Sequence, residues 1–285
     1  MKCKSLVIAV LAGWVLPWAM YAVAEQFLIS KAETQHLEDI TEPSVTETET
    51  EQTGRFVSVL LSDGNTVCME LNDYLTGVVL GEMPASFETE ALKAQAVVAR
   101  TYTLKRQLAA HKHNGGAVCT DSSCCQAYCT EEAYLAAGNT REHLNKVKRA
   151  VSDTEYAVLL YDGALIDATY FSCAGDRTEA AVAVWGTDVP YLQSVESPGE
   201  EMSRHYVDSV VFTAEEFMER INENLTGPPE CWIGEITYTD GGGVDTIQIA
   251  GKEHQGTRLR QQLGLRSTDF QITAIGNTVT VTTKG

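Results

Sequence analysis

The hydrophobic pattern of the chain is most pronounced over residues 71–102, where two apolar segments meet at the turn Gly81-Glu-Met-Pro84. Helix-forming residues then run without Gly or Pro from Ser86 past Leu108, which predicts a helix. Ala, Val and Leu occupy most of its faces and leave a narrow polar strip, so we expect this long helix to be buried. Ser86 or Thr89 is its expected N-terminal cap.

Shorter alternating segments predict strands and two further helices. Their order lacks the regular strand–helix–strand repeat of a parallel sheet, so we predict an α+β fold with mixed sheets. The expected elements are a hairpin of 56–61 and 66–71, a helix near 140–152, a hairpin of 156–161 and 164–171 turned by Asp162-Gly163, a strand at 207–212, a helix at 213–224 capped by Thr213 with Glu216, and three strands around Tyr238, Ile247 and Val279.

The start of the chain has the pattern of a membrane anchor. Lys2 and Lys4 precede the uncharged stretch Leu6–Ala24, which is long enough to cross a bilayer. The lysines place the N-terminus inside, so the remainder of the chain is exported. Ala22-Val-Ala24 also matches a cleavage site, and a removed signal peptide is the alternative. We favour an uncleaved single-pass anchor over residues 1–24, because the apolar run exceeds the usual signal-peptide core.

Residues 25–54 are acidic, rich in Thr and Glu, and lack apolar periodicity, which is typical of a solvated tether. Residues 55–285 are then expected to form one large domain or two closely joined lobes. The formal net charge of the chain is −18. Such a charge argues against nucleic acid or an anionic membrane surface as the partner.

Glu82 is a candidate general acid/base. Apolar neighbours such as Leu80 and Met83 favour its protonated form, whereas nearby cations favour the carboxylate. Lys93 and Arg100 are seven residues apart and therefore share the polar strip of the long helix. The alternative is that Glu82 pairs with one of these cations and only holds the helix in place.

The segment after the long helix is rich in Cys and His, and its residues leave several chemistries open. An exported protein lies where thiols oxidise, so Cys119, Cys124, Cys125 and Cys129 can form disulfides. His113, Cys119 and Cys125 are evenly spaced by six residues, and both residue types bind zinc. Free thiols in a core are the third possibility, because the spacing matches no zinc-finger pattern.

Taken in order, several motifs of the chain resemble the stage II sporulation protein D family, which is related to amidase enhancer proteins. Each motif is weak alone, but their succession from residue 55 to the end is specific. They are Tyr74-Leu-Thr-Gly-Val-Val79, Gly81-Glu-Met-Pro84, the stretch 90–102, Cys125-Gln-Ala-Tyr128, the passage 173–179, Val184-Trp-Gly186, Pro190-Tyr-Leu192 and the stretch 263–270.

The resemblance implies a membrane-anchored lytic transglycosylase that cleaves peptidoglycan glycan strands during forespore engulfment. The catalytic glutamate of the family lies in its Glu-Met-Pro motif, which corresponds to Glu82. Such an enzyme needs one carboxyl group, because the C6 hydroxyl of muramic acid is the nucleophile and a 1,6-anhydro sugar is the product. Lys93, Arg100, Arg177 and Thr178 are the expected substrate-binding or supporting residues.

The resemblance also implies a zinc ion held by His113, Cys119 and Cys125 beside the active site. Cys124 departs from the family, which often has His there, and Cys129 is an additional thiol. We expect a zinc ion to order the loop beside Glu82 rather than activate water. The implied partners are a second wall hydrolase that removes stem peptides and an integral membrane scaffold.

The end of the chain departs from the family, in which a strand like 278–283 leads into a Gly-His-Gly-rich segment. The chain ends at Gly285, so we expect it to be C-terminally truncated and part of the groove to be missing. This departure supports an alternative function, a non-catalytic wall-binding protein that stimulates an amidase.

Overall fold

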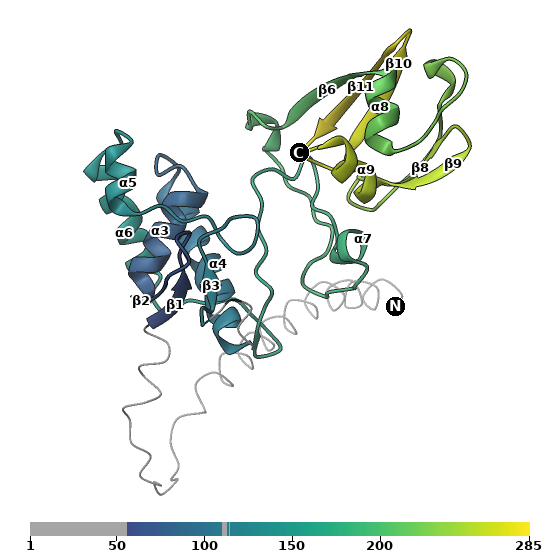
Figure 1. Cartoon of the computed structure of the whole chain (residues 1–285). Coiled ribbons are helices and arrows are strands. Elements are labelled where there is room, and N and C mark those ends of the chain that lie inside the picture. Colours follow the sequence, from purple (N-terminus) through teal and green to yellow (C-terminus); the bar gives the residue numbers. More distant parts are fainter. Residues whose placement is uncertain (1–55, 110–112, 114) are drawn as a thin grey trace, which may run out of the picture. The chain divides into compact units, whose positions relative to one another are not determined.

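The computed structural model describes residues 56–109, 113 and 115–285 of the chain (Figure 1). The predicted anchor (1–24) and tether (25–54) lie outside the described residues. Within the described ranges, no helix is both long enough and apolar enough to cross a bilayer. Helices and small sheets are mixed along the chain, which confirms the α+β class.

The first hairpin is confirmed. β1 (Phe56–Leu60) pairs antiparallel with β2 (Thr66–Glu70). The turn between them is closed by Asn65, whose backbone N–H donates to Asp63 Oδ1 at 2.9 Å. β3 (Val118–Cys119) adds parallel to the other side of β1, which makes this sheet mixed.

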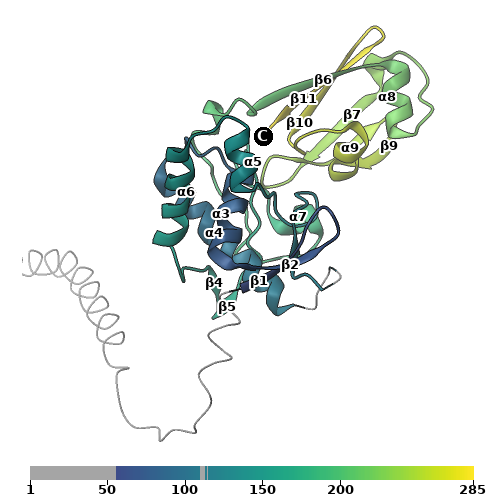
Figure 2. The same ribbon diagram turned by 60° about the vertical axis from the view of Figure 1, so that its left-hand side comes forward.

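Three helices pack against one another and bury the first hydrophobic cluster (Figure 2). They are α3 (Leu71–Glu82), α4 (Thr89–Leu108) and α6 (Arg141–Asp153). The predicted long helix corresponds to α4, which contributes Leu92, Ala96 and Ala99 to this cluster. The short helix α5 (Glu131–Ala136) adds the buried Tyr134.

Two predictions for this part of the chain need correction. Neither Ser86 nor Thr89 caps α4, because Thr89 is already helical and Ser86 lies in the preceding turn; Glu88 is the cap residue and makes no side-chain cap hydrogen bond. The second hairpin is much shorter than predicted, with β4 (Leu160–Tyr161) and β5 (Ala164–Leu165). The remaining residues of that region form irregular structure.

The C-terminal part builds a second hydrophobic cluster from two antiparallel three-stranded sheets and two helices. The capping box of Thr213 and Glu216 is present at the start of α8, as predicted. Sequence patterning missed β9, β10 and α9, of which β9 and α9 are mostly polar and bury only a few side chains. The elements are β6 (Val207–Thr213), α8 (Ala214–Ile221), β7 (Ile233–Tyr238), β8 (Val244–Ile249), β9 (Lys252–Gln255), α9 (Gly256–Leu263), β10 (Phe270–Ile275) and β11 (Thr278–Lys284); α7 (Ala181–Trp185) precedes them.

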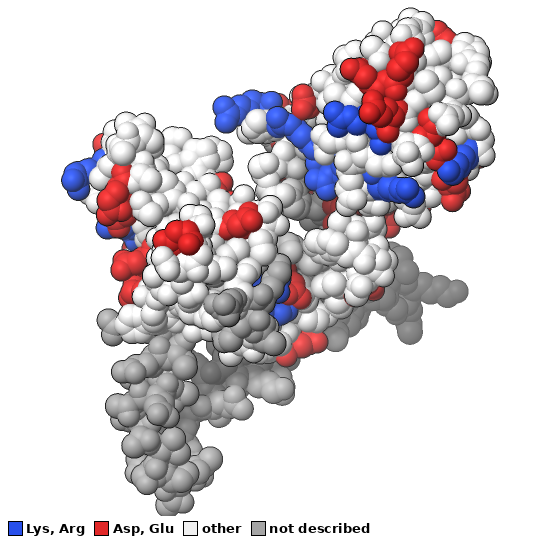
Figure 3. Space-filling model, viewed as in Figure 1, with Lys and Arg blue, Asp and Glu red and all other residues white. Residues whose placement is uncertain are grey.

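Charge is unevenly distributed over the face in Figure 3. Basic side chains gather mainly on the part that carries the C-terminal strands, where acidic side chains lie beside them. The part with the first cluster shows more acidic than basic side chains. On this face, then, acidic and basic side chains are mixed on the part that carries the C-terminal strands.

Arg100 is a buried structural cation. Its side chain is 2% exposed, and its guanidinium donates to the carbonyl oxygens of Thr154 at 2.6 Å and Val151 at 3.1 Å. These carbonyl groups lie at the end of α6, which carries a partial negative charge, and they also accept from Thr154 Oγ1 and from the Ala157 N–H. Burial lowers the pKa of Arg100, while the nearby Glu155 opposes that shift. Arg100 therefore ties α4 to α6.

We expect Arg100→Met to lower the free energy of unfolding by about 3 kcal/mol, because it removes the buried donor that joins α4 to the carbonyl oxygens of Val151 and Thr154. Urea denaturation of the purified protein measures this loss. Lys93→Met is the matched control on the same strip, since the ion pairs of Lys93 with Glu90 and Asp153 are partly exposed. Equal losses in the two variants would contradict the structural role of Arg100.

Candidate functional site

Glu82 is the last residue of α3 and is half-buried. Its Oε1 accepts two hydrogen bonds, from the backbone N–H of Ala127 at 2.6 Å and from the hydroxyl group of Tyr170 at 3.0 Å. No hydrogen bond to Oε2 is found in the described part of the chain. One carboxyl oxygen is therefore fixed by protein donors, and the other is available for proton transfer.

Glycine residues of α3 allow the 127–128 backbone to approach the helix. A Cβ atom at Gly81 would lie 2.9 Å from both the Ala127 carbonyl carbon and the Tyr128 nitrogen. One at Gly77 would lie 2.2 Å from the Tyr128 ring. Glycine inside a helix costs about 0.5–1 kcal/mol relative to alanine. This cost is offset by a close contact that brings the Ala127 N–H to Glu82.

Among the described residues, no hydrogen bond or ion pair joins the other predicted supporting residues to Glu82. Lys93 and Arg100 do share one strip of α4, but this strip faces the C-terminal end of α6, where the helix dipole favours cations. Arg100 is too buried to contact a substrate. Arg177 and Thr178 bond to the neighbouring loop segment, and their partners are Ser194 and Glu196 for Arg177 and Gln193 and Val195 for Thr178.

A His/Cys cluster lies at the end of β3. Ligand atoms of His113, Cys119, Cys124 and Cys125 all lie within 4.8 Å of one another. Nε2 of His113 is 3.2 Å from Sγ of Cys125 and 4.0 Å from Sγ of Cys124. Tetrahedral zinc, with bonds of about 2.0–2.3 Å, separates its ligand atoms by about 3.6–3.8 Å. The predicted trio is thus brought together, and Cys124 joins it.

A turn presents the two adjacent cysteines to the cluster. The backbone N–H groups of Cys124 and Cys125 donate to the carbonyl oxygen of Asp121 at 3.0 and 2.8 Å. Cys119 is buried, and burial is the main cause that raises the pKa of its thiol to about 11. Without a bound cation this thiol stays protonated at neutral pH, whereas coordination to zinc would deprotonate it.

Two tyrosines near the cluster fit a bound metal. Burial, followed by the hydrogen bond with Cys125, raises the pKa of Tyr102 to about 12. Burial also raises the pKa of Tyr74, with the charge of Cys125 as the next cause. The Tyr74 hydroxyl group is buried and has no hydrogen-bond partner among the described residues. Metal-bound thiolates accept hydrogen bonds, so these phenols suit the surroundings of a zinc site.

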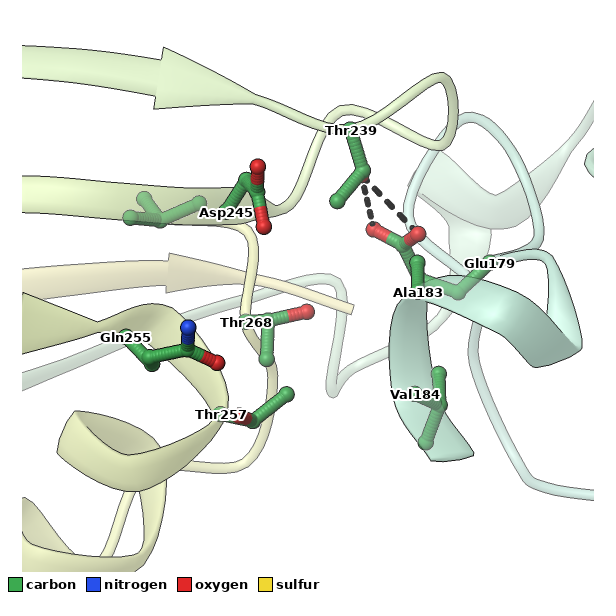
Figure 4. Close-up of a pocket in the computed structure, with 9 residues that line it drawn as sticks. Glu179, Ala183, Val184, Thr239, Asp245, Gln255, Thr257 and Thr268 are labelled. Atoms are coloured by element: carbon green, nitrogen blue, oxygen red, sulfur yellow. Dashed lines mark hydrogen bonds between the residues drawn. The ribbon is translucent and has the colours of Figure 1, made fainter. Parts of the chain in front are cut away.

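A separate small cavity surrounds Glu179 (Figure 4). Its carboxylate accepts hydrogen bonds from Thr239 Oγ1 at 2.8 and 2.9 Å and from the backbone N–H of Gly243 at 2.8 Å. The cavity volume is about 20 Å³, which is too small for a sugar ring. Glu179 therefore anchors its loop to the 239–243 turn, and this cavity is not a glycan site.

Sequence reasoning missed the partners of Glu82. The Ala127 donor is a backbone N–H, which leaves no signal in residue type. Tyr170 lies 88 residues after Glu82 in the chain. The motif Cys125-Gln-Ala-Tyr128 could have indicated the contact with Ala127, because it connects the His/Cys cluster to the segment that contacts Glu82.

Comparison with known proteins places these residues in a family context. Residues 64–161, which include Glu82 and the His/Cys cluster, match the family model SpoIID, stage II sporulation protein. The chain is 39% identical over 220 residues to "Stage II sporulation protein D" of Bacillus subtilis (strain 168), covering 75% of this chain and 64% of the relative. The protein of the same name from Bacillus amyloliquefaciens is 37% identical over 220 residues, with 75% and 63% covered.

A more distant similarity joins the chain to the "Amidase enhancer" of Bacillus subtilis (strain 168). The two are 32% identical over 174 residues, which is 61% of this chain and 21% of the relative. The chain spans less than two thirds of the length of either stage II sporulation protein D.

We expect Gly81→Ala to lower the free energy of unfolding by about 1–3 kcal/mol, because the added methyl group meets backbone atoms that cannot move aside. Gly77→Ala meets only the Tyr128 ring. Adding Tyr128→Ala should therefore reduce the loss of unfolding free energy caused by Gly77→Ala but not the loss caused by Gly81→Ala. Urea denaturation of the single and double variants tests this difference, and equal relief at both positions would contradict the backbone contact.

We also expect the purified protein, with its thiols kept reduced, to contain about one zinc ion per chain by elemental analysis. Cys119→Ser and Cys125→Ser should lose the metal. Cys129→Ser is the matched control, because Cys129 lies outside the cluster and its Sγ donates to the Thr130 carbonyl oxygen. A metal-free wild-type protein with intact thiols would contradict the assignment.

Proposed function

The chain belongs to the stage II sporulation protein D family, and from this membership and the surroundings of Glu82 we propose that it is a peptidoglycan lytic transglycosylase. Its substrate would be the glycan strand, which it would cleave during forespore engulfment. The observation that carries the proposal is the environment of Glu82: one oxygen is fixed by Ala127 and Tyr170, while the other is left for proton transfer.

A single carboxyl group suits this reaction better than ordinary hydrolysis. Hydrolysing glycosidases place two carboxyl groups about the scissile bond, one as acid and the other as base or nucleophile. In the proposed reaction the sugar supplies its own nucleophile, so a second carboxyl group is not required.

The reaction returns Glu82 to its initial state. Protonated Glu82 donates its proton from Oε2 to the glycosidic oxygen as the bond from that oxygen to C1 breaks. The C6 hydroxyl oxygen of the same muramic acid then bonds to C1, and its proton passes to the Glu82 carboxylate. The products are a 1,6-anhydro sugar and a free hydroxyl group, and no water is consumed. Intramolecular attack also gains effective concentration.

The His/Cys cluster has a supporting role in this proposal. His113, Cys119, Cys124 and Cys125 would hold a zinc ion, which supplies a fixed point for the loop. Cys125 is followed directly by Gln126 and then by Ala127, the donor to Glu82. A zinc ion that fixes Cys125 would therefore also restrict the motion of Ala127, two residues later, and of the Glu82 carboxyl group that Ala127 contacts.

The cellular setting follows from the same proposal. Residues 1–24 would anchor the protein in the membrane, with the catalytic part outside; secretion after cleavage of a signal peptide is the alternative. A wall hydrolase that removes stem peptides and an integral membrane scaffold are the proposed partners, and nucleic acid is not among them.

The second candidate function is that of a non-catalytic wall-binding protein that stimulates an amidase. The similarity to an amidase enhancer over 61% of the chain favours it. Digestion of peptide-stripped glycan separates the two functions. Anhydro ends produced by the protein alone support the enzyme, whereas an effect that needs an added amidase supports the accessory role.

We expect Glu82→Gln to bind peptide-stripped glycan but to release anhydro product at least about 10²-fold more slowly, because the amide cannot exchange the proton. Mass spectrometry of the released sugars measures the rate. Glu88→Gln is the matched control, since Glu88 is an exposed carboxylate without a side-chain cap bond. A wild-type rate in Glu82→Gln would remove Glu82 from the mechanism.

A further inference from the structure

A chain of polar side chains leads from Glu82 into the first hydrophobic cluster. Tyr170 donates to Glu82 Oε1 at 3.0 Å, and Gln126 Nε2 donates to the Tyr170 hydroxyl oxygen at 3.3 Å. Gln126 Oε1 lies 3.0 Å from Thr103 Oγ1 on α4, whose one proton is shared with the Ala99 carbonyl oxygen at 2.8 Å. Gln126 and Thr103 are both 0% exposed. The Tyr170 hydroxyl group is therefore hydrogen-bonded to a buried side chain, Gln126, as well as to Glu82.

The arrangement fixes the direction of the Tyr170 proton. Gln126 donates to the phenol oxygen, so the phenol proton must point elsewhere, and Glu82 Oε1 is its acceptor. Burial is the main cause that raises the pKa of Tyr170, and the charges of Glu82 and Tyr102 act in the same direction against the opposing Gln126 hydrogen bond. Tyr170 thus remains a neutral donor throughout the working pH range.

The second donor to Oε1 comes from the same segment. Ala127 follows Gln126, and its backbone N–H reaches Oε1 at 2.6 Å. Side chain and backbone of consecutive residues therefore act on one carboxyl oxygen, Ala127 directly and Gln126 through Tyr170. Rotation of the carboxyl group would break both hydrogen bonds to Oε1.

We propose that Tyr170, held by Gln126, is a positioning residue that fixes Oε1 of Glu82 and so assigns the proton exchange with the sugar to Oε2. This inference rests on the proposed transglycosylase function and adds a role that the family motif around Glu82 does not contain. Tyr170 acts on the reaction through the Glu82 carboxyl group, to which it donates.

The hydrogen bond from Tyr170 also acts during the proton transfer. Its hydrogen bond stabilises the carboxylate that exists after the proton has moved to the glycosidic oxygen, and the carboxylate then takes the proton of the C6 hydroxyl group. Without this hydrogen bond the carboxylate loses one of its two donors, and the carboxyl group is free to turn away from the sugar.

The test compares rates and pH profiles of Tyr170→Phe and the wild-type protein on peptide-stripped glycan. We expect a fall in kcat of about 10–100-fold, with KM unchanged within about twofold, because orientation is lost while the substrate surface is kept. The descending limb of the pH–rate profile should move to higher pH, because Glu82 must be protonated to begin the reaction. Gln126→Leu should also lower kcat and move the descending limb to higher pH, but by smaller amounts than Tyr170→Phe.

Matched variants separate positioning from folding. Tyr206→Phe is the control, because Tyr206 also donates to a carboxylate, that of Asp176, and should leave kcat and the pH profile unchanged. Replacement of Tyr170 by 3,5-difluorotyrosine keeps the shape and makes the phenol a stronger donor. We expect this variant to fold and to move the descending limb to lower pH.

The outcomes distinguish this inference from the proposed function. Loss of activity in Glu82→Gln together with wild-type kcat and pH profile in Tyr170→Phe would overturn the role of Tyr170 and leave the enzyme intact. Full activity of Glu82→Gln would overturn the proposed function itself. If Tyr170→Phe fails to fold, an unchanged pH profile in the difluorotyrosine protein contradicts the inference.

Discussion

The close approach of the 126–128 segment to helix α3 is the contact on which the rest of the site depends. It is possible because Gly81 has no side chain, and a methyl group there would meet the backbone of Ala127 and Tyr128. This contact gives Glu82 its shortest hydrogen bond, at 2.6 Å. It also places Gln126 behind Tyr170. A small residue in a helix thus determines the orientation of a carboxyl group one residue away.

The same segment joins the two candidate sites of the protein. The His/Cys cluster ends at Cys125; the next residue, Gln126, donates to Tyr170, and Ala127 donates to Glu82. A metal ion at the cluster would limit the motion of this segment without taking part in the chemistry. A purely structural metal fits a reaction in which the substrate provides the nucleophile and one carboxyl group first donates a proton and then accepts one.

Much of the fold could be predicted from local patterns, whereas the neighbours of the site could not. An uninterrupted run of helix-forming residues located α4, turn residues located the first hairpin, and Thr213 with Glu216 located the start of α8. Helical spacing showed that Lys93 and Arg100 share one side of α4, but it could not show that this side faces α6 and not Glu82. Tyr170 was missed because its contact with Glu82 depends on tertiary packing across 88 residues.

The central claim is that Glu82 alone moves the proton while the sugar attacks itself, and the source of the new oxygen at C1 tests this most directly. Peptide-stripped glycan is digested in water enriched in oxygen-18, and the products are weighed by mass spectrometry. The account predicts unlabelled 1,6-anhydro ends, because no water enters the reaction. New reducing ends labelled at C1, in excess of those in a matched Glu82→Gln digest kept in the same water, would contradict it, because forming them requires water as the nucleophile.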